Sequence, residues 1–248
     1  MKKLLFFLLI FAGIQARAQE LRGVVTYEYS QDWIKIASRL PYLSLDQKER
    51  IKSTYKNYTG SKSIMKLYFN ADQSLYSYES DYTRSEDGRW SWRNSDYVIR
   101  RDFKQGTRTE IIEMLGKTFI VEDSLAEPKW KILNQLKDIA GHVCMKAETD
   151  DPIKSQKITA WFAQDIPVSA GPEMYYGLPG LILELDINDG DVVVTATQVE
   201  LKDVSKELAA VKKIKGKKIK AAEYDKLLTD HIKTAIKAQE NPYWTIRY

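Results

Sequence analysis

Residues 158–186 read ITAWFAQDIPVSAGPEMYYGLPGLILELD, and this stretch decides the fold. Its two ends alternate side chains between two faces, as β-strands do, and its middle is rich in glycine and proline. Proline fixes φ and removes a backbone donor, whereas glycine accepts backbone angles that other residues resist. The stretch therefore predicts a strand, an ordered loop and a second strand.

Large apolar side chains surround this loop, and two interpretations of them stay open. In the first, they pack under the sheet and pin the loop down, so that the loop is structural. In the second, they form the wall of a groove that holds an apolar or extended ligand. The candidate ligand-binding residues are Trp161, Phe162, Tyr175, Tyr176 and Leu178.

Short alternating segments separated by turn residues continue on both sides of the stretch. Residues 188–191, Asn-Asp-Gly-Asp, are a strong hairpin signal, because Asp-Gly readily adopts the positive φ angles of a tight turn. Other predicted strands contain many Val, Thr and Tyr residues, which suit a half-buried pleated surface. They cover residues 21–30, 64–69, 74–79, 97–103, 108–114, 118–121, 129–133, 139–147, 157–162, 181–187 and 191–201.

Two segments show helical periodicity. Residues 45–58 follow Ser44, and residues 221–239 place apolar side chains at three- and four-residue steps until Pro242. We expect both helices to cover part of the sheet. Strands in a run with two helices predict an α+β fold, a curved, mostly antiparallel, half-barrel-like sheet covered by one or two helices. Residues 19–248 are expected to form this single domain.

The first eighteen residues have the three-part pattern of a secretory signal. Lys2 and Lys3 precede an apolar run, and residues 16–18, Ala-Arg-Ala, offer the small side chains that a signal peptidase accepts. The apolar run of roughly 11 residues is too short for a membrane-spanning helix, which needs about 20. We therefore expect export, with cleavage between Ala18 and Gln19.

Without this signal the chain is nearly neutral. It contains 38 basic and 34 acidic residues, and the signal holds Lys2, Lys3 and Arg17, so 35 basic and 34 acidic residues remain. This balance gives no reason to expect nucleic acid as a partner. The lysines within residues 212–220 form a local basic run, which we interpret as a solvated linker.

The single cysteine, Cys144, has no partner for an internal disulfide. In an alternating strand it shares a face with His142, and such a pair can bind a metal or act as nucleophile and base. A structural metal site usually needs four ligands, however, and the chain has one further histidine, His231. We interpret Cys144 as a buried thiol and expect no metal site.

Residues 177–182, Gly-Leu-Pro-Gly-Leu-Ile, resemble the motif that names the GLPGLI family, also called the Porph_ging family, of exported Bacteroidetes proteins. The resemblance implies a location in the envelope of a Gram-negative cell, either periplasmic or associated with the outer membrane. The family has no established activity, so the resemblance implies no catalytic residue. Its signature residues here are Asp165, Pro167, Gly171, Pro172, Gly177, Leu178, Pro179, Gly180, Leu181, Ile182 and Glu184.

The sequence favours a binding protein over an enzyme. It contains no G-x-S-x-G, H-E-x-x-H or phosphate-loop motif, and two histidines leave few ways to form a triad. The expected function is a non-catalytic binding or carrier module for a lipid or a peptide, without a cofactor. Two alternatives stay open. One is docking to an outer-membrane receptor or transporter through an exposed sheet edge. The other is a hydrolase that uses Asp165 and Glu184 as a carboxylate pair.

Overall fold

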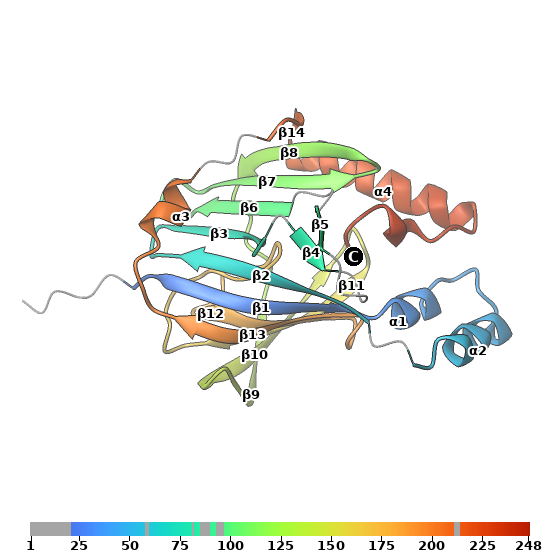
Figure 1. Ribbon diagram of the computed structural model, residues 1–248, viewed down its shortest axis with the longest axis horizontal. Helices are drawn as coiled ribbons and strands as arrows, with labels where there is room; N and C mark the ends of the chain where they lie inside the picture. The colour runs from blue at the N-terminus through green and yellow to red at the C-terminus, as the bar shows by residue number, and fades with distance from the viewer. Residues whose placement is uncertain (1–20, 58–59, 81, 85–89, 93–96, 211–213) are drawn as a thin grey trace, which may run out of the picture.

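One large curved sheet dominates the fold (Figure 1). The computed structural model describes residues 21–248 except 58–59, 81, 85–89, 93–96 and 211–213, so the predicted signal segment lies outside the described residues. Twelve strands follow the order β14-β8-β7-β6-β3-β2-β1-β13-β12-β11-β10-β9, and β14 runs parallel to β8 whereas the other neighbours pair antiparallel. The predicted α+β class with a curved, mostly antiparallel sheet is confirmed.

The strands of this sheet follow the predicted alternating segments closely. Their bounds are β1 Gly23–Gln31, β2 Ser61–Phe69, β3 Gln73–Tyr78, β6 Tyr97–Asp102, β7 Thr107–Met114, β8 Lys117–Ser124, β9 Lys131–Ile139, β10 His142–Asp151, β11 Gln156–Ala163, β12 Leu181–Ile187, β13 Val192–Glu200 and β14 Lys217–Ile219. Two short strands, β4 Tyr82–Arg84 and β5 Trp90–Trp92, form a separate two-stranded sheet. Asn188, Asp189 and Gly190 all have positive φ, as the predicted β12–β13 hairpin requires.

The main core lies on the inner face of the curve. Along β1, alternate residues such as Val25, Tyr27 and Tyr29 are buried, because successive side chains of a strand point to opposite faces. Residues of β2, β3, β6 and β7 continue this face across the sheet. A smaller outer cluster joins Val24 and Leu75 to the short helix α3 (Ser205–Ala209).

The predicted helices differ in how they use the sheet. Helix α4 (Ala221–Lys237) buries Tyr224, Leu228 and Ala235, as expected for a covering helix. Helix α2 (Leu45–Thr54) has a capping box at Ser44 but no buried residue. The expectation that α2 covers the sheet is therefore wrong, because α2 projects from the body beside α1 (Trp33–Ser38), as Figure 1 shows.

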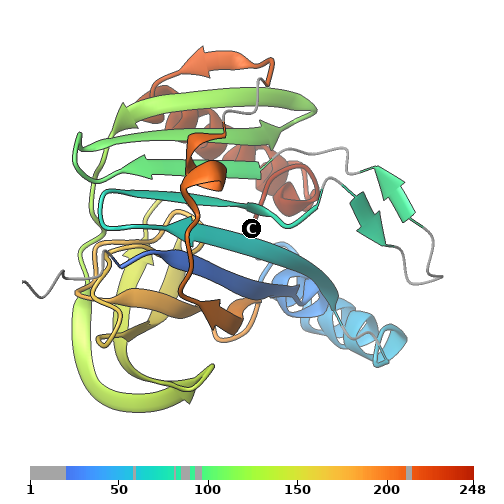
Figure 2. The same ribbon diagram turned by 60° about the vertical axis from the view of Figure 1, so that its left-hand side comes forward.

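Further bounds differ from prediction. Helix α2 ends at Thr54, before the predicted end at residue 58, which lies outside the described residues. A reversal at Ala140 and Gly141, both at positive φ, separates β9 from β10, so residues 139–147 are not one strand. Part of the basic run, at Lys217–Ile219, forms edge strand β14 rather than a solvated linker. At the other end of the sheet, edge strand β9 curves strongly (Figure 2) and pairs with β10 from Lys131 to Ile139. No helix in the described residues is both long and apolar enough to cross a membrane.

The loop between β11 and β12, residues 164–180, lies inside the curve. The buried guanidinium of Arg101 on β6 donates to the carbonyl oxygens of Gly171, at 3.1 Å, and Glu173. The Trp130 indole donates to the carbonyl oxygen of Tyr176 at 2.8 Å. This loop, which we call the signature loop, therefore links the two halves of the sheet across the core.

Candidate functional site

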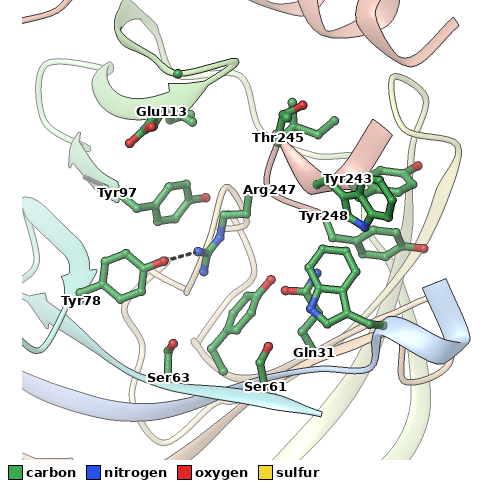
Figure 3. A pocket seen from close by; sticks show the side chains of 16 residues that line it. Gln31, Ser61, Ser63, Tyr78, Tyr97, Glu113, Tyr243, Thr245, Arg247 and Tyr248 are labelled. Atoms are coloured by element: carbon green, nitrogen blue, oxygen red, sulfur yellow. Dashed lines mark hydrogen bonds between the residues drawn. The ribbon is translucent and has the colours of Figure 1, made fainter. Parts of the chain in front are cut away.

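The candidate site is an open pocket of about 500 Å³ at one end of the curved sheet (Figure 3). We call it the mouth pocket. The ends of β1, β2, β3, β6 and β7 surround it together with α1 and the closing segment, which we define as residues 242–248. Its aromatic lining comprises Tyr29, Trp33, Tyr78, Tyr97, Tyr243, Trp244 and Tyr248, and its uncharged polar lining comprises Gln31, Ser61, Ser63 and Thr245.

Strand alternation places these side chains in the pocket. Tyr29 and Gln31 follow Tyr27 on the inner face of β1, and Ser61 and Ser63 pair directly with Gln31 and Tyr29 on β2. Toward this end of β1 and β2 the inward side chains become polar, since Gln31 follows Tyr29 and Ser63 and Ser61 lie beyond Met65. The inner face of the sheet thus ends in an aromatic and hydrogen-bonding surface.

Arg247, which lines the mouth pocket, forms a buried ion pair with Glu173. The Glu173 carboxylate, 5% exposed, accepts from Arg247 Nε at 2.7 Å and Nη2 at 2.6 Å, a bidentate arrangement. The hydroxyls of Tyr76 and Tyr97 also donate to this carboxylate, at 2.9 and 2.8 Å. Because charged bidentate pairs are strong and directional, the pair fixes the signature loop to the closing segment.

The environment of Arg247 is aromatic as well as ionic. Its guanidinium carbon lies 4.0 Å from the ring centre of Tyr97 and 4.2 Å from that of Tyr29, and Nη1 donates to the Tyr78 hydroxyl at 3.1 Å. Stacking on rings suits the planar, weakly hydrated guanidinium. Aromatic rings therefore enclose the Arg247 guanidinium, and the Glu173 carboxylate neutralises its charge.

Burial and charge act in opposite directions on Glu173. Burial alone would raise the pKa of its carboxyl, but Arg247, Tyr97 and Tyr76 together outweigh burial and hold that pKa below its ordinary value. The pKa values of the Tyr76 and Tyr97 phenols are raised, first by burial and then by the Glu173 charge. Glu173 is thus ionised and both tyrosines are neutral donors near pH 7.

This lowered pKa predicts a stability that depends on pH. The ionised Glu173 contributes its full stabilisation above the unfolded pKa, about 4.3, and this contribution disappears as the pH falls through the folded pKa. The difference in unfolding free energy between wild type and Glu173→Gln should therefore shrink below about pH 4, as urea melts would show. Burial raises the pKa of Glu110, so the contribution of Glu110 to stability changes with pH in the opposite direction. This contribution is present in both the wild type and Glu173→Gln, and it cancels when their unfolding free energies are subtracted. A difference that stays constant from pH 7 to pH 3 would contradict the assignment.

The closing segment has a second anchor at Tyr248. Its hydroxyl donates to Asp191 Oδ2 at 2.5 Å and accepts from the Asn188 side-chain amide at 2.7 Å. Arg39 also donates to the buried Asp191 carboxylate, whose Oδ1 has no hydrogen-bond partner among the described residues. The β12–β13 hairpin and α1 thereby hold the end of the segment.

The five candidate ligand-binding residues lie elsewhere. Phe162, Tyr176 and Leu178 are buried in the core, and Trp161 and Tyr175 are partly buried against it. Among the described residues that line the mouth pocket, none of these five occurs. Their contacts support the packing interpretation of the signature loop, and a ligand-binding role for them stays a prediction.

The remaining candidates are engaged in local contacts. Asp165 Oδ2 lies 2.7 Å from His142 Nδ1, and Glu184 accepts from Lys137 at 2.6 Å and Thr195 at 3.1 Å. Burial, followed by nearby carboxylates, raises the pKa of the Cys144 thiol to about 12, so this thiol is a poor nucleophile near pH 7. The described residues contain no group of three or more His, Cys, Asp or Glu side chains that could hold a metal ion.

Sequence reasoning missed Glu173, Arg247 and the closing segment. Pro242 predicts the end of a helix, and three of the six residues after it are aromatic. Such a density of aromatic residues after a helix end indicates a segment that packs against the rest of the protein. The pairing of Arg247 with Glu173, 74 residues away, has no comparable signal in the sequence.

Comparisons with known proteins agree with this architecture. The family model described as "Protein of unknown function (Porph_ging)" matches residues 148–184, which include the GLPGLI motif, so the predicted resemblance is confirmed for this segment. Searching the curated proteins gave no match.

Two solved structures share the fold. They are described as "Structure of PNGF-II in C2 space group" and "Structure of PNGF-II in P21 space group", with TM-scores of 0.54 and 0.53 and 18% and 19% sequence identity. Each alignment covers 84% of this chain but only 32% and 33% of PNGF-II. This chain thus spans about a third of the length of PNGF-II, and at this identity the likeness extends to the fold alone.

Proposed function

We propose that this chain is a non-catalytic binding module of the cell envelope that takes an extended ligand in the mouth pocket. The observation that carries the proposal is the pocket itself, where seven aromatic side chains and four uncharged hydrogen-bonding ones line the space together with Glu113 and Arg247. Binding sites commonly combine apolar walls with a few polar groups that fix orientation. The volume, about 500 Å³, lies within the range of small-molecule and peptide sites.

The lining favours a peptide over a lipid. An acyl chain needs a deep apolar cavity, but the signature loop fills the inside of the curved sheet with Ile166, Val168, Ala170, Tyr176 and Leu178. The space that is left lies at the mouth and mixes rings with hydroxyl and amide groups. An extended peptide offers both apolar side chains and backbone hydrogen-bonding groups, so it matches both components.

Trp244 is the residue best placed to contact such a ligand first. Its side chain is 76% exposed although it lines the pocket, and exposed aromatic residues at the centre of binding surfaces often carry a large share of the affinity. Truncating an exposed side chain changes stability by roughly 0.5 kcal/mol or less, so Trp244→Ala should fold normally.

We expect native mass spectrometry of protein isolated gently from its own cells to detect a bound ligand. Trp244→Ala should weaken binding of that ligand about tenfold, the effect of losing roughly 1.4 kcal/mol. Tyr55→Ala is the matched control, because Tyr55 is 56% exposed on the projecting α2 arm and lies outside the pocket lining. A ligand-free mass for the wild type, or equal affinity for both variants, would refute the proposal.

A second candidate function is docking through β9. This strand is the last of the large sheet, is exposed along most of its length, and presents Ile132 and Leu136 to solvent near Val143 of β10. An extended segment of an outer-membrane receptor could pair with such an edge. The bulge in β9 and its lysines oppose indiscriminate pairing. Docking of this kind would not depend on Trp244, so the same pair of variants separates the two functions.

A further inference from the structure

We infer that the mouth pocket holds its peptide as an added strand, which pairs with a free edge of β2 at residues 61–63. This inference rests on the proposed function and specifies the ligand. The ligand is a short extended peptide with a free backbone N–H at the paired residue and a large apolar or aromatic side chain on the residue beside it. The closing segment stays in place and remains part of the pocket lining.

Strand β2 extends further than its neighbour on one side. It pairs with β1 over residues 61–69, but β3 pairs with it only over residues 65–69. The chain bends away from β2 at Glu79, whose N–H makes the last bond of this ladder, to the carbonyl oxygen of Ile64 at 3.1 Å. Among the described residues, nothing pairs with residues 61–63 on that side.

The backbone of Lys62 supplies the two groups that a peptide would use. In an antiparallel ladder every second residue directs both its N–H and its C=O to the same neighbouring strand. Ile64 directs its C=O to the side of β3, so Lys62, two residues earlier in the same regular strand, directs its N–H and C=O there as well. Neither group has a partner among the described residues, and Lys62 is exposed. An unpaired edge of this kind is a template for an extended segment.

The same pairing would direct side chains of the added strand into the mouth pocket. The side chains of Ser61 and Ser63 point from β2 into the pocket, as Figure 3 shows, and peptide residues opposite them would point the same way. Tyr29 pairs directly with Ser63, and Tyr78 ends β3. Because both serines are small, a large peptide side chain opposite either of them would reach the aromatic lining.

The position of this edge limits the partner to a short peptide. The pocket volume of about 500 Å³ is that of a small-ligand site, so a few extended residues suit it better than a second folded chain. Edge strand β9 is exposed too, but no described residue of β9 lines the pocket. Proline at the paired residue is excluded, because it has no N–H to donate.

The test uses a fluorescein-labelled pentapeptide amide, Thr-Thr-Tyr-Thr-Thr, and the full-length protein. With its tyrosine opposite one of the two serines, the N–H groups of the second and fourth residues face β2 and that of the tyrosine faces away. In fluorescence anisotropy, a peptide that is N-methylated on both the second and fourth residues should bind at least about tenfold more weakly than the parent peptide. N-methylation of the tyrosine alone should change the affinity by less than about twofold.

Lys62→Pro makes the corresponding change in the protein. Proline lacks the N–H that faces the free edge, and because this N–H takes no part in the pairing with β1, the variant should fold. Lys62→Ala is the reference, since it keeps the N–H and removes the same side chain with its exposed ion pair to Glu28. The parent peptide should bind Lys62→Pro at least about tenfold more weakly than Lys62→Ala. Circular dichroism verifies folding, and if Lys62→Pro does not fold, the N-methylated peptides test the same bonds on the wild type.

Equal binding of the parent and the doubly N-methylated peptides would overturn the inference. Equal affinities of the parent peptide for Lys62→Pro and Lys62→Ala, or no binding to the wild type at millimolar peptide, would also overturn it. None of these outcomes affects the proposed function, which depends on a ligand recovered from cells and on Trp244. Conversely, a ligand-free mass together with the expected N-methylation pattern would refute the proposed cellular ligand and leave the peptide-binding edge of β2 established.

Discussion

Replacing Arg247 with alanine is expected to lower the free energy of unfolding by about 3–5 kcal/mol. Among the described residues, the substitution leaves the buried Glu173 carboxylate with Tyr76 and Tyr97 as hydrogen-bond partners, and it opens a gap between the rings of Tyr29 and Tyr97. An uncompensated buried charge costs several kcal/mol, which is a large part of the stability of a typical domain. Denaturant melts at pH 7 would measure the loss.

The double variant Glu173→Gln with Arg247→Met provides the internal check. It removes both charges and keeps much of the side-chain volume, so it should recover part of the stability that Arg247→Ala loses, since replacing a whole buried ion pair is far less costly than removing one partner. Arg50→Ala on exposed α2 should stay within about 0.5 kcal/mol of the wild type. If Arg247→Ala melts like Arg50→Ala, the ion pair does not stabilise the fold.

The second large effect is expected at Gly180. A Cβ on this residue would collide with the carbonyl oxygen of Ala163 and lie 2.8 Å from its carbonyl carbon, where the signature loop returns to the sheet. Backbone atoms of a core strand cannot move away cheaply. Gly180→Ala should therefore cost about 3 kcal/mol, the upper end of the usual range for overpacking, and Gly180→Val should prevent folding.

Gly106 provides the matched comparison. It has φ of +68°, and a Cβ there meets no atom within 4 Å, so Gly106→Ala tests backbone strain alone and should cost about 1 kcal/mol. Thermal or urea melts of the two alanine variants would separate collision from strain. Equal losses would mean that close approach to Ala163 does not explain the glycine at position 180.

Conformational freedom explains a different glycine of the motif. The residue type alone predicts unusual backbone angles for the glycines of the signature loop, and Gly177 indeed has φ of +90°. Gly180 does not lie in the left-handed region, and its role is close packing. Both roles require glycine, so the sequence does not distinguish them, whereas the atoms around each residue do.

Local signals predicted the strands well because they depend on residues close together in the chain. Alternation of side chains, the Asn-Asp-Gly-Asp turn and the apolar stripe of α4 need no distant partner, and each is confirmed. The predicted single strand at residues 139–147 is wrong for a local reason as well. Ala140 adopts a positive φ, which alanine rarely does, so the residue type does not predict the turn. The start of helix α2 at Leu45 is confirmed, but its end at Thr54 comes earlier than predicted, and its expected packing on the sheet depended on tertiary contacts.

The sequence by itself determined the class of this protein: a curved, mostly antiparallel sheet with a rigid, glycine- and proline-rich loop at residues 164–180. The sequence determines this class because alternating burial along a strand and the preferences of turn residues depend only on residues close together in the chain. Only the tertiary structure revealed the mouth pocket and the ion pair beside it. The curvature of the sheet brings Tyr29, Tyr97, Glu173 and Arg247 together from four separate segments, and no local pattern encodes the curvature that makes them meet.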